Sequence, residues 1–254
     1  MSRSILTLLK TQAERYPNKG FLFFKEQEVT YRQFFDRMEQ VAYGLARFKI
    51  ESGDKVAIYL PNCPESLFAF FGILRRGAVA IPLEGDAVVS HLKRSQSRVL
   101  ITTARLYSSM QLKRREMPHL EQLFLVGDRG GEGFVFSSLY ISGPKKFEIE
   151  VDANQHLLSG ADAFVEATQI TERDCLLYTS PWLSSHKQII SMLASLIVGG
   201  SVILLERFSP QFFLNAVDRY RVTAFLGGEL IVKDLFELEE AKQHNLSSLR
   251  FCVL

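Results

Sequence analysis

A short segment in the second half of the chain gathers several side chains that could meet a ligand. Trp182, Ser184 and His186 lie within five residues and follow 175–179, an apolar run that predicts a buried strand. In open α/β sheets, ligands bind where the strands end at their carboxyl side. We therefore expect that an acyl or aryl group could pack on the indole, with the hydroxyl and the imidazole nearby. The simpler alternative is the capped start of a helix beside a half-buried aromatic residue.

The same segment contains a lysine that could hold a phosphate. Lys187 follows two serines and a histidine, and a phosphate site needs such a cation together with backbone N–H groups that face the anion. However, Pro181 has no N–H, and the bulky Trp182 and Leu183 disfavour the positive φ and the close backbone approach that glycine permits. Lys187 is therefore a weak candidate for cofactor binding, and a solvated lysine is the simpler interpretation.

A second candidate site follows the next predicted strand, 222–226. Gly227, Gly228 and Glu229 come directly after it, and the carboxylate could contact a polar ligand at the sheet edge. A glutamate in the first turn of a helix is, however, also favoured by the helix dipole alone. No serine, histidine and acid form a recognisable triad, and the three cysteines lack the spacing of metal ligands. We predict no catalytic residue and no metal site.

An alternation of apolar strands and amphipathic helices must position these residues. It runs from a helix at 4–16 to an apolar strand at 249–254, and predicts an α/β fold with mostly parallel sheets covered by helices. The polar connection 142–152 suggests a boundary between a first α/β subdomain, 1–150, and a second, 151–254. The second subdomain would be incomplete at its C-terminal edge.

Composition limits the classes of partner and compartment. Lys and Arg number 30 against 28 Asp and Glu, with both signs mixed along the chain, so nucleic acid is not an expected partner. The odd number of cysteines and the lack of a long apolar segment at the N-terminus favour a cytoplasmic protein. The apolar segment 189–205 is interrupted by Gly199 and Gly200, so we expect a buried helix, a turn and a strand there, and no membrane span.

Five segments, taken together, point to a known family. They are 16–19 (YPNK), 29–34 (VTYRQF), 53–65 (GDKVAIYLPNCPE), 72–83 (GILRRGAVAIPL) and 199–210 (GGSVILLERFSP). In order and spacing, the chain resembles the adenylate-forming superfamily of acyl-CoA synthetases, also called the AMP-binding family. The resemblance implies the fold of the N-terminal subdomains of these ATP-dependent acid–thiol ligases.

The resemblance also implies features that this sequence does not show. In the family, a loop of serine, threonine, glycine and a lysine cradles the leaving phosphates of ATP. Either Tyr178–Lys187 is an altered form of that loop or, as we prefer, the loop is deleted between about Glu150 and Asn154. The family's Tyr-Gly-x-Thr-Glu segment and its C-terminal domain with the catalytic lysine have no counterpart. The family's Gly-Val-Pro-Thr at the pocket edge stands here as 227–230.

We therefore expect an acyl-CoA-synthetase-like N-terminal region that cannot adenylate a carboxylate by itself and could retain a pocket for an acyl or aryl carboxylate. ATP and Mg are implied by the family alone, and no cofactor is predicted for this chain. One alternative is a noncatalytic interaction or oligomerisation module, in which the open edge after Leu254 pairs with a second copy or a separate partner chain. The other is a truncated or internally deleted form of an active ATP-dependent acyl ligase.

Overall fold

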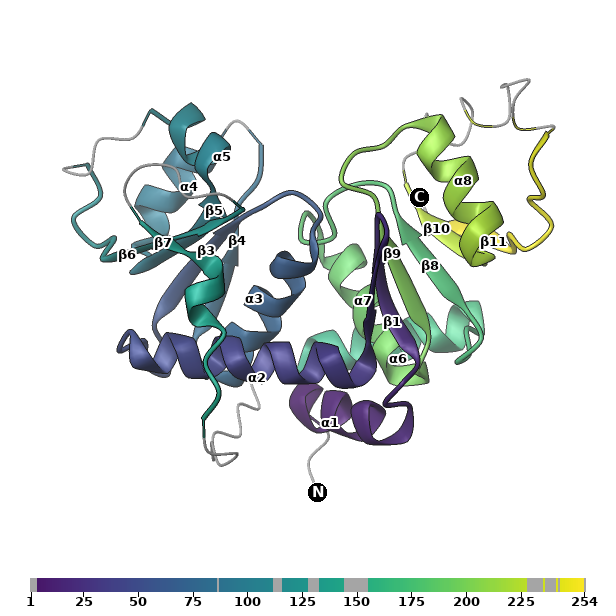
Figure 1. Cartoon of the computed structure of the whole chain (residues 1–254), viewed down its shortest axis with the longest axis horizontal. Helices are drawn as coiled ribbons and strands as arrows, with labels where there is room; N and C mark the ends of the chain where they lie inside the picture. Colours follow the sequence, from purple (N-terminus) through teal and green to yellow (C-terminus); the bar gives the residue numbers. More distant parts are fainter. Residues whose placement is uncertain are drawn as a thin grey trace. The chain divides into compact units, whose positions relative to one another are not determined.

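The computed structural model shows an α/β fold (Figure 1). The residues that it describes are 4–85, 87–111, 116–127, 133–143, 155–227, 235, 241 and 243–253. Two compact units divide the chain. Unit 1 comprises Met1–Phe34, Pro61–Cys63 and Asp152–Leu254, and unit 2 comprises Phe35–Leu60 and Pro64–Val151. Each unit is built around a sheet of its own.

Unit 1 contains a six-stranded sheet, which we call sheet A, with the strand order β11-β10-β8-β9-β1-β2. Its strands are β1 (Gly20–Phe24), β2 (Gln27–Thr30), β8 (Cys175–Tyr178), β9 (Ser201–Leu204), β10 (Ala224–Leu226) and β11 (Phe251–Val253). β2 runs antiparallel to β1 in a hairpin, and the other neighbouring pairs are parallel. The carboxyl ends of β8, β9 and β10 therefore meet at one edge of the sheet.

The N-terminal segment belongs to unit 1 because β1 enters sheet A beside β9. The two strands form a parallel ladder in which Leu22 lies opposite Val202. The preceding helix, α1 (Ile5–Arg15), is capped by a serine side chain, as its sequence predicts. Unit 1 thus takes residues from both ends of the chain, whereas the sequence suggested one subdomain before residue 150 and one after it. The expected connection between them falls largely in 144–154, outside the described residues.

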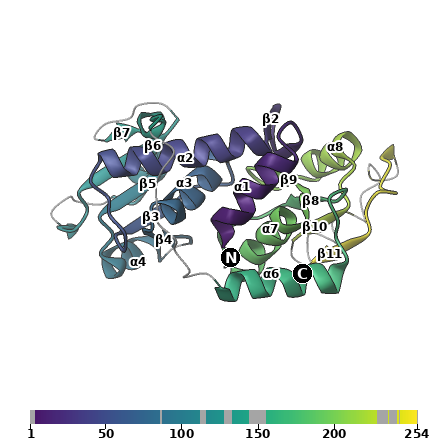
Figure 2. The same ribbon diagram turned by 90° about the horizontal axis from the view of Figure 1, so that it is seen from below.

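Helices cover both faces of sheet A. α6 (Gln155–Thr168) and α7 (His186–Val198) pack side by side (Figure 2), and the Tyr178 hydroxyl of β8 hydrogen-bonds to Ser191 of α7 at 2.9 Å. α8 (Pro210–Tyr220) packs against residues of the opposite face. The core beside α8 contains Cys175, Leu177, Ile203, Phe213, Leu214, Val217 and Phe225. Successive residues of β8 therefore point to different helices, as the pleat of a strand requires.

The apolar segment 189–205 folds as its sequence predicts. Its first part completes α7, and its last part contains β9. Between them, Gly199 caps the helix with a φ of 80°, a left-handed conformation that is free of steric strain for glycine. In the described part of the chain, no helix combines the length and the hydropathy that a membrane span needs.

Unit 2 contains a five-stranded parallel sheet, sheet B, with the order β4-β3-β5-β6-β7. Its strands are β3 (Lys55–Tyr59), β4 (Val79–Pro82), β5 (Val99–Thr103), β6 (Gln122–Val126) and β7 (Phe134–Val135). The helical segments are α2 (Tyr31–Arg47), which begins in unit 1, α3 (Pro64–Arg75), α4 (Val88–Ser95), α5 (Ala104–Ser109) and the 3₁₀ turn η2 (Phe136–Leu139). The predicted class, mostly parallel sheets covered by helices, is confirmed.

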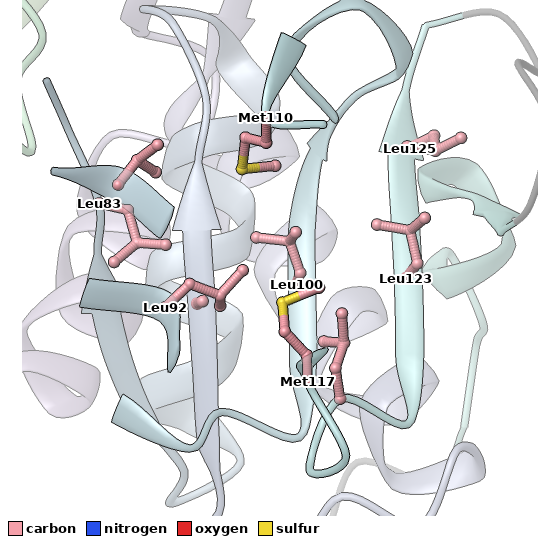
Figure 3. Packing of buried hydrophobic residues seen from close by; sticks show 10 residues of the cluster. Leu83, Leu92, Leu100, Met110, Met117, Leu123 and Leu125 are labelled. Carbon is pink, nitrogen blue, oxygen red and sulfur yellow. The ribbon is translucent and has the colours of Figure 1, made fainter. Parts of the chain in front are cut away.

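One apolar core of unit 2 lies against sheet B (Figure 3). Leu100 of β5 and Leu123 of β6 are opposite each other in the ladder and pack in the same cluster as Leu92 of α4. Met110 and Met117 fill the remaining space, which suits their flexible side chains. Unit 2 therefore has a core of its own.

Candidate functional site

The carboxyl edge of sheet A is the place where the sequence positions most of its candidate residues. At this edge, Thr179 follows β8 and its hydroxyl donates to the Leu226 carbonyl at the end of β10, at 2.7 Å. The Thr179 N–H also reaches that carbonyl, at 3.3 Å. The chain then leaves the sheet in a turn, Thr179–Ser185, that leads into α7. We call this segment the β8–α7 turn.

A buried asparagine from another part of the sequence holds the β8–α7 turn. Asn62, 2% exposed, donates through Nδ2 to the carbonyls of Ser180 and Leu205, each at 2.9 Å. Its Oδ1 accepts the N–H of Trp182, also at 2.9 Å. The two carbonyls belong to the segments that leave β8 and β9. One side chain thus connects two neighbouring strand ends.

Trp182 belongs to unit 1, and its side chain is buried. It is 1% exposed and is among the largest fully buried side chains. A ligand at this edge would therefore meet the indole only after the turn moves. The sequence predicts an aromatic residue at the end of the strand, and in the structure the side chain of that residue is buried.

The serines of the turn are used in local hydrogen bonds. Ser185 caps α7 by accepting the Gln188 N–H at 3.3 Å. The Gln188 side chain donates to Ser180 Oγ at 2.6 Å and accepts from Ser184 Oγ at 3.1 Å. Ser184 is half-buried, and its hydroxyl is directed to the Gln188 side chain. This network supports the turn from the side of α7.

The remaining candidates differ in how the structure places them. His186 and Lys187 are exposed in the first turn of α7. Gly227 directly follows β10 and is half-buried. Gly228 and Glu229 lie outside the described residues. The described candidates are therefore brought to one edge of sheet A, from the ends of β8 and β10.

The buried titratable groups at the two ends of β8, Cys175 at the amino end and Tyr178 at the carboxyl end, are poor nucleophiles. Burial raises the pKa of the Cys175 thiol to about 12, so the thiol stays protonated at neutral pH. Burial likewise raises the pKa of Tyr178, whose hydroxyl bonds to Ser191. Among the described residues, no three His, Cys, Asp or Glu side chains gather in a way that could hold a metal ion.

Three backbone N–H groups of the β8–α7 turn are already bonded within the protein. The N–H of Thr179 donates to Leu226, that of Trp182 to Asn62, and that of Ser184 to the Pro181 carbonyl at 3.0 Å. Pro181 itself has no N–H. From 179 to 184, therefore, no two consecutive N–H groups are available, whereas a phosphate cradle needs several that face the anion.

Sequence reasoning missed Asn62 as a member of this site. Its signal was an asparagine between two prolines, in Pro61-Asn62-Cys63-Pro64, directly after the strand β3. Its partners lie more than a hundred residues further along the chain, and no spacing rule connects them. Only the fold brings the asparagine to the turn.

Comparison with known proteins places this fold in a family. The sequence profile described as AMP-binding enzyme matches residues 9–135, which is half of the chain. Over 307 aligned positions, the chain is 20% identical to the long-chain-fatty-acid–CoA ligase of Bacillus subtilis (strain 168), covering 99% of this chain and 55% of the relative. Over 279 positions, it is 25% identical to the crotonobetaine/carnitine–CoA ligase of Citrobacter koseri, covering 94% and 54%. The chain spans about half the length of these curated relatives.

Solved structures share the same fold. The anthranilate CoA ligase AuaEII, in complex with anthranoyl-AMP, superimposes with a TM-score of 0.87 at 20% identity, covering 98% of this chain and 53% of that one. The N-terminal domain of FACL13 from Mycobacterium tuberculosis gives 0.86 at 18% identity, covering 99% and 69%. The expected resemblance to the N-terminal region of acyl-CoA synthetases is confirmed by these matches and the family profile, and the chain belongs to the AMP-binding enzyme family.

Proposed function

We propose that this acyl-CoA-synthetase-like region binds an acyl or aryl carboxylate at the carboxyl edge of sheet A and does not form an adenylate from ATP by itself. The observation that carries the second half of the proposal is the β8–α7 turn, in which the N–H groups of Thr179, Trp182 and Ser184 are already bonded within the protein. Asn62, Leu226 and Pro181 accept these three hydrogen bonds.

Opening this turn around a triphosphate would break several buried hydrogen bonds. Each such bond contributes about 1 kcal/mol, and a buried group left unsatisfied costs about 1–3 kcal/mol. The three bonds of Asn62 and the two side-chain bonds of Gln188 would be disturbed together. The closed turn therefore opposes phosphate binding in the manner of the family loop.

The alignment with the Bacillus subtilis ligase also supports a missing segment. That alignment has 307 positions and this chain has 254 residues, so at least 53 positions of the relative face no residue of this chain. We infer that the phosphate loop is among them, between about Glu150 and Asn154. Those residues lie outside the described part of the structure.

The carboxylate part of the proposal uses the residues that surround the turn. Lys187 and His186 are exposed at the start of α7, where the ammonium group of Lys187 could attract a carboxylate. Gly227 lies at the end of the nearby strand β10, and Gly228 and Glu229 follow it in the sequence. An acyl or aryl tail would pack toward Trp182 and Ser184 after the β8–α7 turn opens.

Two assays test this function separately. Decanoate and benzoate, titrated by calorimetry, should bind, whereas decanol and benzamide, which lack the charge, should bind more weakly. Lys187→Ala should weaken carboxylate binding several-fold, and Lys10→Ala, which alters an exposed lysine of α1, should not. Carboxylate-dependent release of pyrophosphate from ATP and Mg²⁺ should be absent beside an active acyl-CoA ligase. Absence of carboxylate binding refutes the first half of the proposal, and pyrophosphate release refutes the second.

A second function is favoured by the position of β11. β11 is the last strand in the order of sheet A and pairs with β10, and its other edge has no partner among the described residues. Such an edge can pair with a second copy of the chain or with another chain. Sedimentation velocity would distinguish this module, through a mass that rises with concentration.

A shortened ligase would instead gain pyrophosphate release when the remaining half of a relative is supplied.

A further inference from the structure

We propose that Asn62 is a positioning residue that keeps the β8–α7 turn closed and sets the shape of the carboxyl edge of sheet A. The effect on a carboxylate ligand rests on the function proposed above. The effect on the turn does not, because it follows from the hydrogen bonds of the protein alone.

The hydrogen-bonding capacity of the Asn62 amide matches its surroundings. Its two N–H groups are directed to two carbonyls, of Ser180 and Leu205, and its oxygen accepts the Trp182 N–H. No other side chain of similar size supplies two donors and one acceptor in this arrangement. A leucine or an ionised aspartate, which have a similar branched shape, would leave at least two of the three partners unsatisfied.

The turn needs the Asn62 amide because two of its backbone groups have no hydrogen-bond partner in the sheet. The ladder of β8 ends at Tyr178, so the Ser180 carbonyl and the Trp182 N–H, on either side of Pro181, have no partner in its ladders with β9 and β10. Buried backbone groups are almost always paired, and Asn62 pairs both of these. The asparagine thus replaces the missing ladder bonds at the point where β8 and β9 diverge.

The position of Asn62 in the chain makes its role specific. Pro61–Cys63 belongs to unit 1, although the residues on both sides of it in the sequence belong to unit 2. Within unit 1, the Asn62 side chain of this tripeptide hydrogen-bonds to the turn. Trp182, Ser184 and the start of α7 consequently depend on a residue that is distant in sequence.

Trp182 makes the proposal measurable, because it is the single tryptophan of the chain. Its fluorescence reports the β8–α7 turn without interference. In the unaltered protein, we expect blue-shifted emission and weak quenching by acrylamide, since the indole is 1% exposed. Asn62→Ala should shift the emission to the red and raise the quenching constant several-fold, at temperatures where circular dichroism shows a folded protein.

The variant Asn62→Asp adds a pH dependence. An ionised carboxylate would face two carbonyl oxygens, so the closed turn favours the protonated form and raises the pKa of Asp at this position above about 3.9. Closure is therefore present at low pH and lost as pH rises through the raised value. Quenching of Trp182 should increase with pH in this variant and stay flat in the unaltered protein. A general loss of packing would not titrate.

Gln12→Ala is the matched control. Gln12 is another buried amide, 4% exposed, and donates to the Ile197 carbonyl at the far end of α7, at 2.8 Å. α7 has 13 residues, so its ends lie about 20 Å apart at about 1.5 Å per residue. This variant should lower the melting temperature and leave the quenching of Trp182 unchanged.

Carboxylate binding by the same variants distinguishes this inference from the proposed function. Because the acyl tail can pack toward Trp182 only after the turn opens, affinity for decanoate should rise several-fold in Asn62→Ala and stay unchanged in Gln12→Ala. If the unaltered chain binds no carboxylate while Asn62→Ala exposes Trp182, the proposed function is wrong and the positioning role stands. If Asn62→Ala fails to fold, Asn62→Asp across pH decides instead. Quenching of Trp182 that is the same in the unaltered protein and in the Asn62 variants would overturn the inference.

Discussion

At the scale of single residues, the amino end of β8 is held by a buried carboxylate. Asp174, 3% exposed, accepts the Thr171 N–H at 2.7 Å and an Arg250 N–H at 2.7 Å. Burial alone would raise the pKa of Asp174, but hydrogen bonds from Thr223, Thr171 and Arg250 outweigh it and hold the pKa below its usual value. The ionised group therefore fastens the segments before β8 and β11 to each other.

Asp174→Asn should destabilise the protein by about 2–3 kcal/mol at pH 7, because it removes charge-assisted hydrogen bonds from a buried position. Since the folded pKa is depressed, the contribution of Asp174 is present above the unfolded value of about 3.9 and is lost as pH falls through the folded value. Urea unfolding at pH 7 and pH 3 should show a difference between the variant and the unaltered protein that shrinks in acid.

Glu172→Gln provides the control for that experiment. Glu172 is exposed and only two residues away, so its neutralisation should change the free energy of unfolding by less than about 0.5 kcal/mol. A loss in Asp174→Asn that is the same at both pH values would contradict the role assigned to the charge.

At the scale of elements, the start of α7 fixes one end of the β8–α7 turn. The Ser185 side chain accepts the Gln188 N–H at 3.3 Å, and Ser209 caps α8 in the same way, accepting from Phe212 at 3.2 Å. Both are serine N-caps in unit 1, yet only the first adjoins the turn that Asn62 holds. Their comparison separates helix stability from the shape of the candidate site.

Ser185→Ala and Ser209→Ala should each lower the free energy of unfolding by about 1 kcal/mol through loss of an N-cap. Thermal or urea unfolding measures this loss. Quenching of Trp182 in the folded state should rise in Ser185→Ala and remain unchanged in Ser209→Ala. Equal quenching in the two variants would mean that the cap does not support the turn.

Many elements could be predicted because their signals are local. The run Cys175–Tyr178 is wholly apolar, and the structure buries all four residues between α7 and α8. Serine and glycine likewise marked both ends of α7. The pairing of β1 with β9 could not be read in this way, because it joins segments nearly two hundred residues apart.

The candidate site was predictable only in part, for the same reason. Trp182, Ser184 and His186 follow a strand, so their place at the sheet edge was evident. The almost complete burial of the indole was not evident, and neither was the bond from the Trp182 N–H to Asn62, which comes from a distant part of the chain. Gly228 and Glu229 lie outside the described residues and stay predictions.

At the scale of the whole molecule, two sheets with separate cores make up the described chain. Unit 1 contains Leu177 in the core beside α8, and unit 2 contains Leu100 in the core of sheet B. Both leucines are fully buried. Because Trp182 belongs to unit 1, its fluorescence follows the unfolding of that unit, whereas circular dichroism follows both.

Leu100→Ala should destabilise unit 2 by about 3 kcal/mol, through lost burial and the cavity left behind. Its unfolding curve by circular dichroism should shift to lower urea than its curve by Trp182 fluorescence. In Leu177→Ala, the fluorescence curve should shift by a similar amount. Coincident curves in Leu100→Ala would mean that the two units unfold as a single cooperative structure.

The proposed function requires that the β8–α7 turn does not bind a triphosphate. Calorimetric titration of the purified chain with ATP and Mg²⁺, beside an active acyl-CoA ligase, tests this most directly. We predict no heat of binding and no rise in melting temperature for this chain. Micromolar ATP binding by this chain, with tighter binding in Pro181→Gly, would contradict the proposed function. It would mean that Thr179–Ser185 works as a phosphate loop.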